Sequence, residues 1–196
     1  MDQQTIEVYD ARAQEYADAF SGDEPNRYLK EFVDRVPLGG HVLDFGCGPG
    51  SDAALMMQLG LNVSAIDASE KMVEAALSRN VNAQQSTFDD LTDTSKYDGV
   101  WANFSLLHAP REKLPENLRA IHRALRSGGI FHIGMKTGEN SRRDRIGRSY
   151  TYYGPMELND MLAAAGFTIL NQSTGESPGL DGTVAPWVIL LCKRND

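Results

Sequence analysis

Cysteine is scarce in this sequence, whose 196 residues include only Cys47 and Cys192. Two cysteines cannot form the dense disulfide framework of a small secreted domain. The N-terminal residues are polar, with no basic segment followed by an apolar one, and no apolar run approaches the roughly 20 residues that a membrane span needs. We therefore expect a soluble, cytoplasmic protein with no membrane contact.

Positive charge is also scarce, because 19 lysines and arginines are outnumbered by 27 aspartates and glutamates, which gives a formal net charge of −8. Binding along nucleic acid requires many phosphate contacts from lysine and arginine. This balance argues against a nucleic-acid partner and favours a small or cationic one. The sequence has no internal repeat or low-complexity segment, and its length suits one domain.

Glycine, by contrast, is concentrated in one turn. Residues 41–45 form an apolar run that predicts a buried strand, and Gly46, Gly48 and Gly50 follow it at once. Residues 51–59 then predict a helix. A strand, a glycine turn and a helix N-terminus together form the crevice in which an open α/β sheet holds a nucleotide-like ligand.

The spacing of this turn argues against a dinucleotide. Dinucleotide-binding turns have the pattern Gly-x-Gly-x-x-Gly, whereas this one is Gly-x-Gly-x-Gly and is preceded by Asp44. A carboxylate at that place repels a pyrophosphate but accepts a hydrogen bond from an ammonium group. The stretch resembles the first motif of the class I S-adenosylmethionine-dependent methyltransferases, acidic-x-Gly-x-Gly-x-Gly, and further matches follow in the family's order along nearly the whole chain.

The resemblance implies an α/β fold, namely a doubly wound, mostly parallel seven-stranded sheet with an antiparallel last strand, helices on both faces and an N-terminal helical cap. Hydrophobic periodicity predicts one amphipathic helix over residues 1–20, ending at Ser21-Gly22, and a second helix that begins at Pro25. We expect one methyltransferase domain over 1–196, with the cap at 1–40 and a Rossmann-like core at 41–196. Strands are predicted at 41–45, 62–66, 81–86, 97–102, 130–135, 167–170 and 183–192.

S-adenosylmethionine is the cofactor that the resemblance implies, with S-adenosylhomocysteine as its product. Asp67 ends the second predicted strand, where a carboxylate can accept from both ribose hydroxyls, although a dinucleotide enzyme would use the same device. The family's pattern places Phe88 against the adenine ring, Asp89 at its amino group and Tyr16 over the cofactor; ordinary core packing is the other interpretation of Tyr16. The expected cofactor-binding residues are Tyr16, Asp44, Gly46, Cys47, Gly48, Gly50, Asp67, Ala68, Phe88, Asp89, Asn103 and Ser105.

Methyl transfer from a sulfonium is an in-line displacement, to which a protein contributes mainly by positioning and desolvation, so a base is not obligatory. If the acceptor is a hydroxyl or a protonated amine, a base would help. His108 follows the fourth predicted strand and is the best-placed candidate, with His132 and Lys136 as weaker ones. A histidine that only hydrogen-bonds the backbone is the alternative interpretation of His108.

A basic cluster at residues 142–148 interrupts the acidic composition, and tyrosines follow it. In the resembled family, insertions after the fifth strand often build the acceptor pocket. Arginines there could hold a carboxylate or phosphate by forked hydrogen bonds, and a solvated loop is the alternative. The expected substrate-binding residues are Arg145, Arg148 and Tyr152, and no metal site is expected.

The segment Asn-Phe-Ser-Leu at 103–106 also bears on the substrate. Methyltransferases that act on exocyclic amines of DNA bases carry an acidic, amide or serine residue followed by Pro-Pro-aromatic here, and cytosine-carbon enzymes carry a Pro-Cys dipeptide. This chain has neither. The sequence therefore predicts methyl transfer to a small metabolite, with an anionic acceptor as the finer hypothesis. A nicotinamide-dependent oxidoreductase and a non-catalytic S-adenosylmethionine-binding protein remain the alternatives, and the oligomeric state stays open.

Overall fold

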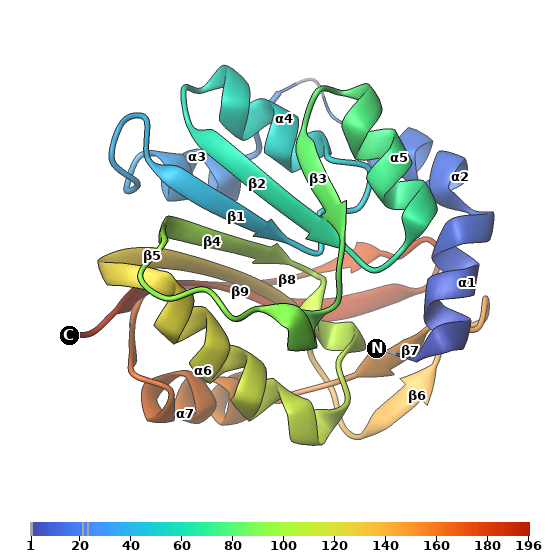
Figure 1. Ribbon diagram of the computed structural model, residues 1–196. Helices are drawn as coiled ribbons and strands as arrows, with labels where there is room; N and C mark the ends of the chain where they lie inside the picture. The colour runs from blue at the N-terminus through green and yellow to red at the C-terminus, as the bar shows by residue number, and fades with distance from the viewer. Residues whose placement is uncertain (1, 21, 23) are drawn as a thin grey trace.

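A seven-stranded sheet forms the centre of the computed structural model, which describes residues 2–20, 22 and 24–196 (Figure 1). The strand order is β3-β2-β1-β4-β5-β9-β8, in which β9 alone runs antiparallel to its neighbours. This arrangement confirms the predicted fold class. The strands are β1 (His41–Phe45), β2 (Asn62–Asp67), β3 (Asn82–Gln85), β4 (Tyr97–Asn103), β5 (Leu125–Lys136), β8 (Phe167–Pro178) and β9 (Val184–Arg194).

Helices cover both faces of the sheet, and each face has its own apolar core. The central strands β1, β4 and β5 are largely buried, as their apolar runs predict, whereas the edge strand β3 is mostly exposed. One face carries α3 (Arg27–Val33), α4 (Ser51–Gln58) and α5 (Glu70–Ser78), and the other carries α6 (Leu114–Ala124) and α7 (Pro155–Ala164). Among the described residues, no helix has the length and apolar character to cross a bilayer.

The N-terminal segment contains two helices where the sequence predicted one, α1 (Gln3–Ala11) and α2 (Ala13–Phe20). The break is at Arg12, whose backbone (φ −121°, ψ 20°) leaves the helical region. Hydrophobic periodicity runs through the break, so it could not reveal it. Both helices lie across the end of the sheet to which the parallel strands point (Figure 1).

The boundaries after α2 also differ from the prediction. The predicted helix end at Ser21 lies outside the described residues. The next helix does not begin at Pro25, because Asn26 caps it by accepting hydrogen bonds from the backbone N–H groups of Tyr28 and Leu29. Asparagine is a strong N-cap because its side-chain oxygen satisfies these otherwise free N–H groups.

Two strands, which lie at either end of the arginine cluster, are absent from the sequence prediction. Ser141–Arg143 (β6) pairs with Ser149–Thr151 (β7) in an antiparallel hairpin. Asp144 closes the turn, since its Oδ1 accepts from the N–H groups of Ile146 at 3.1 Å and Arg148 at 2.9 Å. The hairpin lies below α1 at the same end of the sheet (Figure 1).

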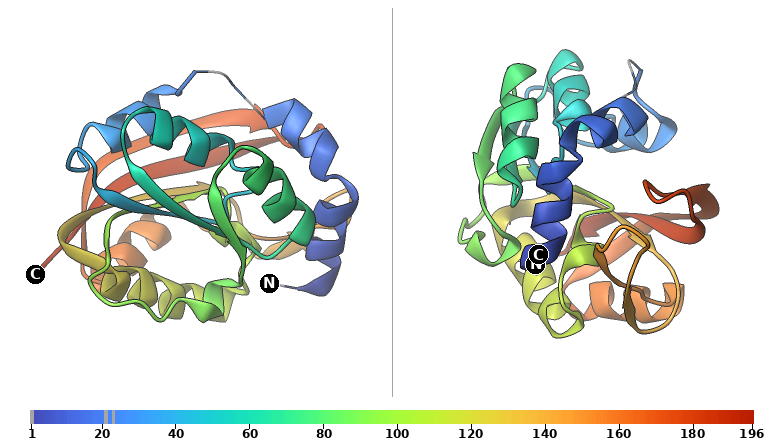
Figure 2. Two further views of the ribbon diagram at one scale, coloured as in Figure 1. Left: turned by 45° about the horizontal axis from the view of Figure 1, so that its top comes forward. Right: turned by 90° about the vertical axis from the view of Figure 1, so that its right-hand side faces the viewer.

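The last two strands extend beyond the predicted bounds, and their connecting turn is short. β8 continues to Pro178 rather than ending at Leu170, and β9 begins at Val184. Polar residues in the second half of β8 removed the apolar signal for a strand, yet β9 still pairs with them through to Pro178. The hairpin they form projects past the parallel strands, beside the β6–β7 hairpin (Figure 2).

Candidate functional site

A cavity of about 500 Å³ opens at the carboxyl end of the parallel strands. Small-molecule sites in proteins have volumes of about 300–1,000 Å³. The ends of β1, β2 and β4 form one wall, α1 and α2 form another, and the β8–β9 turn closes the far side. The position matches the crevice in which open α/β sheets bind ligands, at the point where the strand order reverses.

The glycine turn shapes the floor of this cavity. Gly46 has φ of +87°, and a Cβ at that place would lie 2.3 Å from the Cβ of Ser105, so only glycine lets the two segments approach. Ser105 in turn donates a hydrogen bond from Oγ to the carbonyl of Phe45. Gly50 serves packing instead, because a Cβ there would lie 2.8 Å from the Cβ of Ala76 in α5.

Three carboxylates gather at the β1–β2 end of the cavity, which we call the acidic end: Asp44, Asp52 and Asp67. Asp67 accepts from the backbone N–H groups of Gly48 and Ser69, each at 2.9 Å. Asp44 is 2% exposed, and its Oδ2 has no hydrogen-bond partner among the described residues. Burial, then the charges of Asp52 and Asp67, raises the pKa of Asp44. This end therefore offers acceptors to a ligand that carries donors or positive charge.

Two cations lie at the opposite end, which we call the basic end. Arg148 is 2% exposed, and its Nε donates to Asp144 Oδ2 at 2.9 Å. The Arg148 guanidinium lies 5.2 Å from the centre of the Tyr150 ring, and the Lys136 ammonium lies 4.8 Å from the same centre. Arg148, Lys136 and Tyr150 all line the cavity. The cavity thus has ends of opposite charge.

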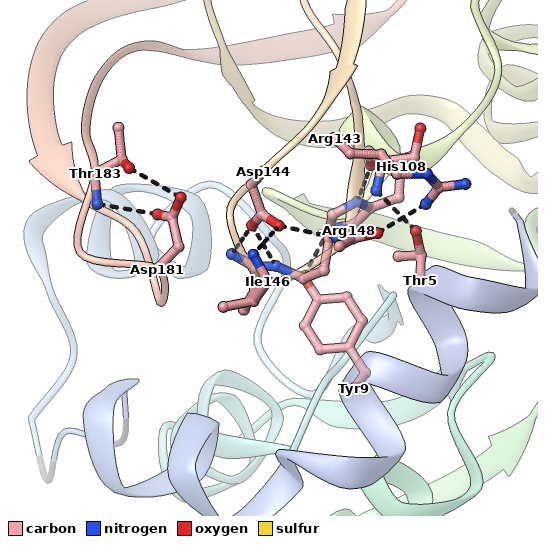
Figure 3. A network of polar contacts seen from close by, with 11 residues as sticks. Thr5, Tyr9, His108, Arg143, Asp144, Ile146, Arg148, Asp181 and Thr183 are labelled. Atoms are coloured by element: carbon pink, nitrogen blue, oxygen red, sulfur yellow. Dashed lines mark hydrogen bonds and ion pairs between the residues drawn. The ribbon is translucent and has the colours of Figure 1, made fainter.

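His108 lines the cavity, but both of its ring nitrogens are engaged (Figure 3). Nδ1 lies 2.7 Å from the carbonyl oxygen of Ser149, which can only accept, so Nδ1 carries the proton. Nε2 then accepts from the Tyr9 hydroxyl at 2.7 Å, and Tyr9 itself accepts from Arg148 Nη1 at 3.0 Å. Burial lowers the pKa of His108 to about 4. His108 is thus a neutral residue that orients Tyr9.

The segment after β4 carries backbone strain. Phe104 has φ of +56°, in the left-handed region that non-glycine residues rarely adopt. The conformation is held by a hydrogen bond from the Phe104 N–H to the carbonyl of Gly134 at 3.0 Å, and by Ser105. It places Asn103, Phe104 and Ser105 together on the cavity wall. Strain of this kind concentrates at functional sites, where the surrounding structure holds it in place.

Most of the residues expected at the site do line the cavity. Phe88 packs its ring 5.0 Å from that of Phe45, and Tyr16 lies 5.7 Å from Tyr9, ring centre to ring centre. The expected residues on the wall are Tyr16, Asp44, Gly46, Cys47, Gly48, Asp67, Ala68, Phe88, Asn103, Ser105, His108 and Arg148.

Four expected residues lie away from the wall. Gly50 faces α5, and the exposed Asp89 lies 3.7 Å from the ammonium of Lys113. Arg145 is exposed in the β6–β7 turn. Tyr152 is buried in the core, 6.0 Å from the Tyr150 ring and under the guanidinium of Arg142. The structure thus brings Arg148, and not its neighbour Arg145, to the cavity.

Several wall residues were missed by the sequence analysis. Asp52 accepts from Trp101 Nε1 at 2.9 Å, and its position in the first turn of α4 was the available signal. Trp187 and the β8–β9 turn had no signal, because they reach the cavity only through the unpredicted length of that hairpin. His132, a weaker candidate base, is stacked on Trp101 with ring centres 3.5 Å apart and lies outside the cavity lining.

Comparison with known proteins gives matches in sequence and in structure. Residues 42–129 match the family described as a methyltransferase domain. A trans-aconitate 2-methyltransferase from Azoarcus is 30% identical over 134 residues, covering 64% of this chain and 51% of the relative. The chain therefore spans about half the length of that curated relative.

Two solved structures share the fold over nearly the whole chain. The 1,6-didemethyltoxoflavin-N1-methyltransferase of Burkholderia thailandensis superposes with a TM-score of 0.75 at 22% identity, covering 97% of this chain and 88% of that one. The [4+2]-cyclase SpnF superposes with a TM-score of 0.74 at 19% identity, covering 98% and 96%. Residues 42–129 are thus similar to a methyltransferase domain, and the strand order and the superpositions show that the whole chain has the Rossmann-like fold of S-adenosylmethionine-dependent methyltransferases.

Proposed function

We propose that this protein binds S-adenosylmethionine at the acidic end of the cavity and transfers its methyl group to a small anionic molecule at the basic end. The observation that carries the proposal is the division of charge within one cavity, with Asp44 and Asp67 at one end and Lys136 and Arg148 at the other. A net charge of −8 and the cavity's modest volume favour a small acceptor over nucleic acid.

The residues of the acidic end fit the cofactor. The unpartnered Oδ2 of Asp44 is a buried acceptor suited to the ammonium of an amino acid. Asp67 stands at the end of β2, where a carboxylate accepts from ribose hydroxyls, and Phe88 offers an apolar surface to a base. When bound, S-adenosylmethionine supplies an electrophilic methyl group with a neutral leaving group.

The protein's contribution to transfer is to align the acceptor and exclude water. Tyr9, Tyr16 and Phe20 of the N-terminal helices cover the cavity, and Phe104 is locked in one backbone conformation beside it. Positioning two reactants in this way contributes roughly 7–11 kcal/mol to catalysis in favourable cases. Because His108 is neutral and doubly hydrogen-bonded, we propose that it positions Tyr9 rather than removing a proton.

The alternatives differ in what they require of the site. A dinucleotide would bring a pyrophosphate towards Asp44, Asp52 and Asp67, which repel it. The likeness to a cyclase shows that this fold also serves other chemistry, so the fold alone does not establish methyl transfer. The trans-aconitate relative is named for a carboxylate acceptor, in agreement with the basic end of this cavity.

Two measurements, made one after the other, test the proposal. Calorimetric titration with S-adenosylmethionine, S-adenosylhomocysteine and NAD should show binding of the first two and not the third. Transfer of a radiolabelled methyl group is then assayed on a panel of small carboxylic acids, each paired with its neutral amide. Methylation of acids and not of their amides supports the proposal, whereas NAD binding alone, or a preference for neutral acceptors, would overturn it.

A further inference from the structure

Lys136 is a cation on the cavity wall that has no direct ion-pair partner among the described residues. It ends β5 and is partly buried, yet among the described residues no carboxylate lies within the 4.0 Å of an ion pair. Arg148, by contrast, has Asp144 at 2.8 Å. The charge of Arg148 is balanced by a direct ion pair, whereas the charge of Lys136 is opposed only at longer range, by the carboxylates of Asp181 and Asp144.

The ammonium has a defined position. It lies 4.8 Å from the centre of the Tyr150 ring on one side and against the β8–β9 turn on another, where a Cβ built on Gly179 would lie 2.8 Å from Nζ. Residues 177–180 of that turn line the cavity with it. The charge is therefore held at the basic end by an aromatic ring and a turn.

The sheet order separates this charge from the cofactor end. β4 lies between β1, which carries Asp44, and β5, which ends at Lys136. The carboxylate of the cofactor's amino acid belongs with its ammonium, which Asp44 suits, at the β1 end of the cavity. The charge on Lys136 is thus available to the second ligand.

We propose that Lys136 binds a carboxylate of the methyl acceptor, with the Tyr150 ring against the acceptor's carbon skeleton, and so determines which acceptors are used. This inference rests on the proposed function and assigns its anion recognition to one residue. Arg148, fixed by Asp144 and Tyr9, adds positive potential behind Tyr150. Burial, followed by the nearby charge of Arg148, lowers the pKa of Lys136, and the carboxylates of Asp181 and Asp144 offset this effect only in part.

The test uses benzoate and benzamide as probes of equal shape, titrated by calorimetry into protein saturated with S-adenosylhomocysteine. Wild type should bind benzoate more tightly than benzamide. Lys136→Met should weaken benzoate binding tenfold or more and leave benzamide within twofold, whereas Lys136→Arg should retain most of the benzoate affinity. Lys30→Met, which removes an exposed lysine of α3, is the matched control and should change neither.

A second variant moves the charge without removing it. Gly179→Ala places a methyl group 2.8 Å from the position of the Lys136 Nζ, which must then shift, and because Nζ is the end of a flexible chain the fold can accommodate the change. Benzoate binding should weaken severalfold in this variant while its circular dichroism spectrum stays that of wild type. An unchanged benzoate affinity in both Lys136→Met and Gly179→Ala would overturn the proposal.

The remaining outcomes separate this inference from the proposed function. If Lys136→Met weakens S-adenosylhomocysteine binding instead of benzoate binding, the lysine holds the cofactor's carboxylate and the proposal is wrong. If Lys136→Arg loses acceptor turnover while keeping benzoate affinity, the residue acts as a base, which also contradicts it. If S-adenosylhomocysteine does not bind but benzoate selectivity depends on Lys136, the proposed function fails and the anion site stands.

Discussion

Asp44 carries a buried carboxylate whose Oδ2 has no hydrogen-bond partner among the residues that the structure describes. Every neighbour that shifts its pKa raises it, because burial disfavours the charged form and Asp52 and Asp67 repel it. A group whose folded-state pKa is raised destabilises the folded protein as the pH rises from the ordinary value of 3.8 through the folded value. This cost in stability is consistent with the ligand-binding role that we propose for Asp44.

Asp44→Asn should therefore separate binding from folding. We expect the variant to be at least as stable as wild type in urea unfolding without ligand, with a growing advantage as the pH rises. Affinity for S-adenosylhomocysteine should fall about tenfold to a hundredfold, since a hydrogen bond to a charged group contributes about 1.5–3 kcal/mol. Asp160→Asn, on the exposed side of α7, is the control; a less stable Asp44→Asn with unchanged affinity would contradict the assignment.

His108 makes the stability of the folded protein depend on pH in the opposite direction to Asp44. Its pKa is lowered from 6.5 to about 4, so the unfolded chain binds a proton that the folded protein does not, and stability is lost as the pH falls through that window. Between pH 7 and pH 5 this linkage costs wild type about 2 kcal/mol. His108→Gln should be less stable than wild type at pH 7, and the gap should narrow by about that amount at pH 5 in urea unfolding. A gap of constant size would show that folding does not shift the pKa of His108.

At the scale of single elements, the sequence predicted the acidic end of the cavity, whose residues are marked by local patterns such as glycine turns and strand ends. Strand β1 and the acids Asp44 and Asp67 sit next to glycine turns or strand ends, so spacing located them. The basic end of the cavity depends on pairing between distant segments. Nothing local distinguishes Arg148, buried against Tyr9 of α1, from the exposed Arg145 three residues earlier, and the polar half of β8 is a strand only because β9 pairs with it.

The β8–β9 hairpin holds Trp187 in the cavity wall by a close packing contact. A Cβ on Gly175 would lie 2.4 Å from Trp187 Cζ2, so Gly175→Ala should displace the indole. Overpacking of this kind costs about 1–3 kcal/mol of unfolding free energy, and tryptophan fluorescence should shift with it. In a Trp187→Leu background, Gly175→Ala should leave the unfolding free energy nearly unchanged. If it lowers the unfolding free energy as much as in wild type, the strain lies in the backbone and not at the indole.

At the scale of the whole molecule, α1 joins the two ends of the cavity. Its Asp10 accepts from Ser69 Oγ at 2.6 Å on the cofactor side. On the acceptor side its Thr5 accepts from the Ser149 N–H at 2.9 Å, and its Tyr9 contacts Arg148 (Figure 3). A ligand at either end therefore acts on the same helix.

Hydrogen exchange should report this link. S-adenosylhomocysteine at a hundred times its dissociation constant stabilises a protein by about 2.7 kcal/mol, and we expect the largest slowing of amide exchange in residues 3–20. Asp10→Ala should speed exchange across α1 in the ligand-free protein, whereas Gln14→Ala, exposed in α2, should not. Protection that is largest in β5 rather than in α1 and α2 would contradict the proposed cover.

The antiparallel β9 has a consequence for how such a protein can diversify. Because β9 turns back along β5, the wall at residues 177–187 is one hairpin at the far end of the sheet order from β2 and β1. Under the proposed function, substitutions or insertions in that hairpin would change which acceptor fits the cavity and leave the residues of the acidic end unchanged. Under the same proposal, related proteins could differ in substrate through changes in this single hairpin and still catalyse the same reaction.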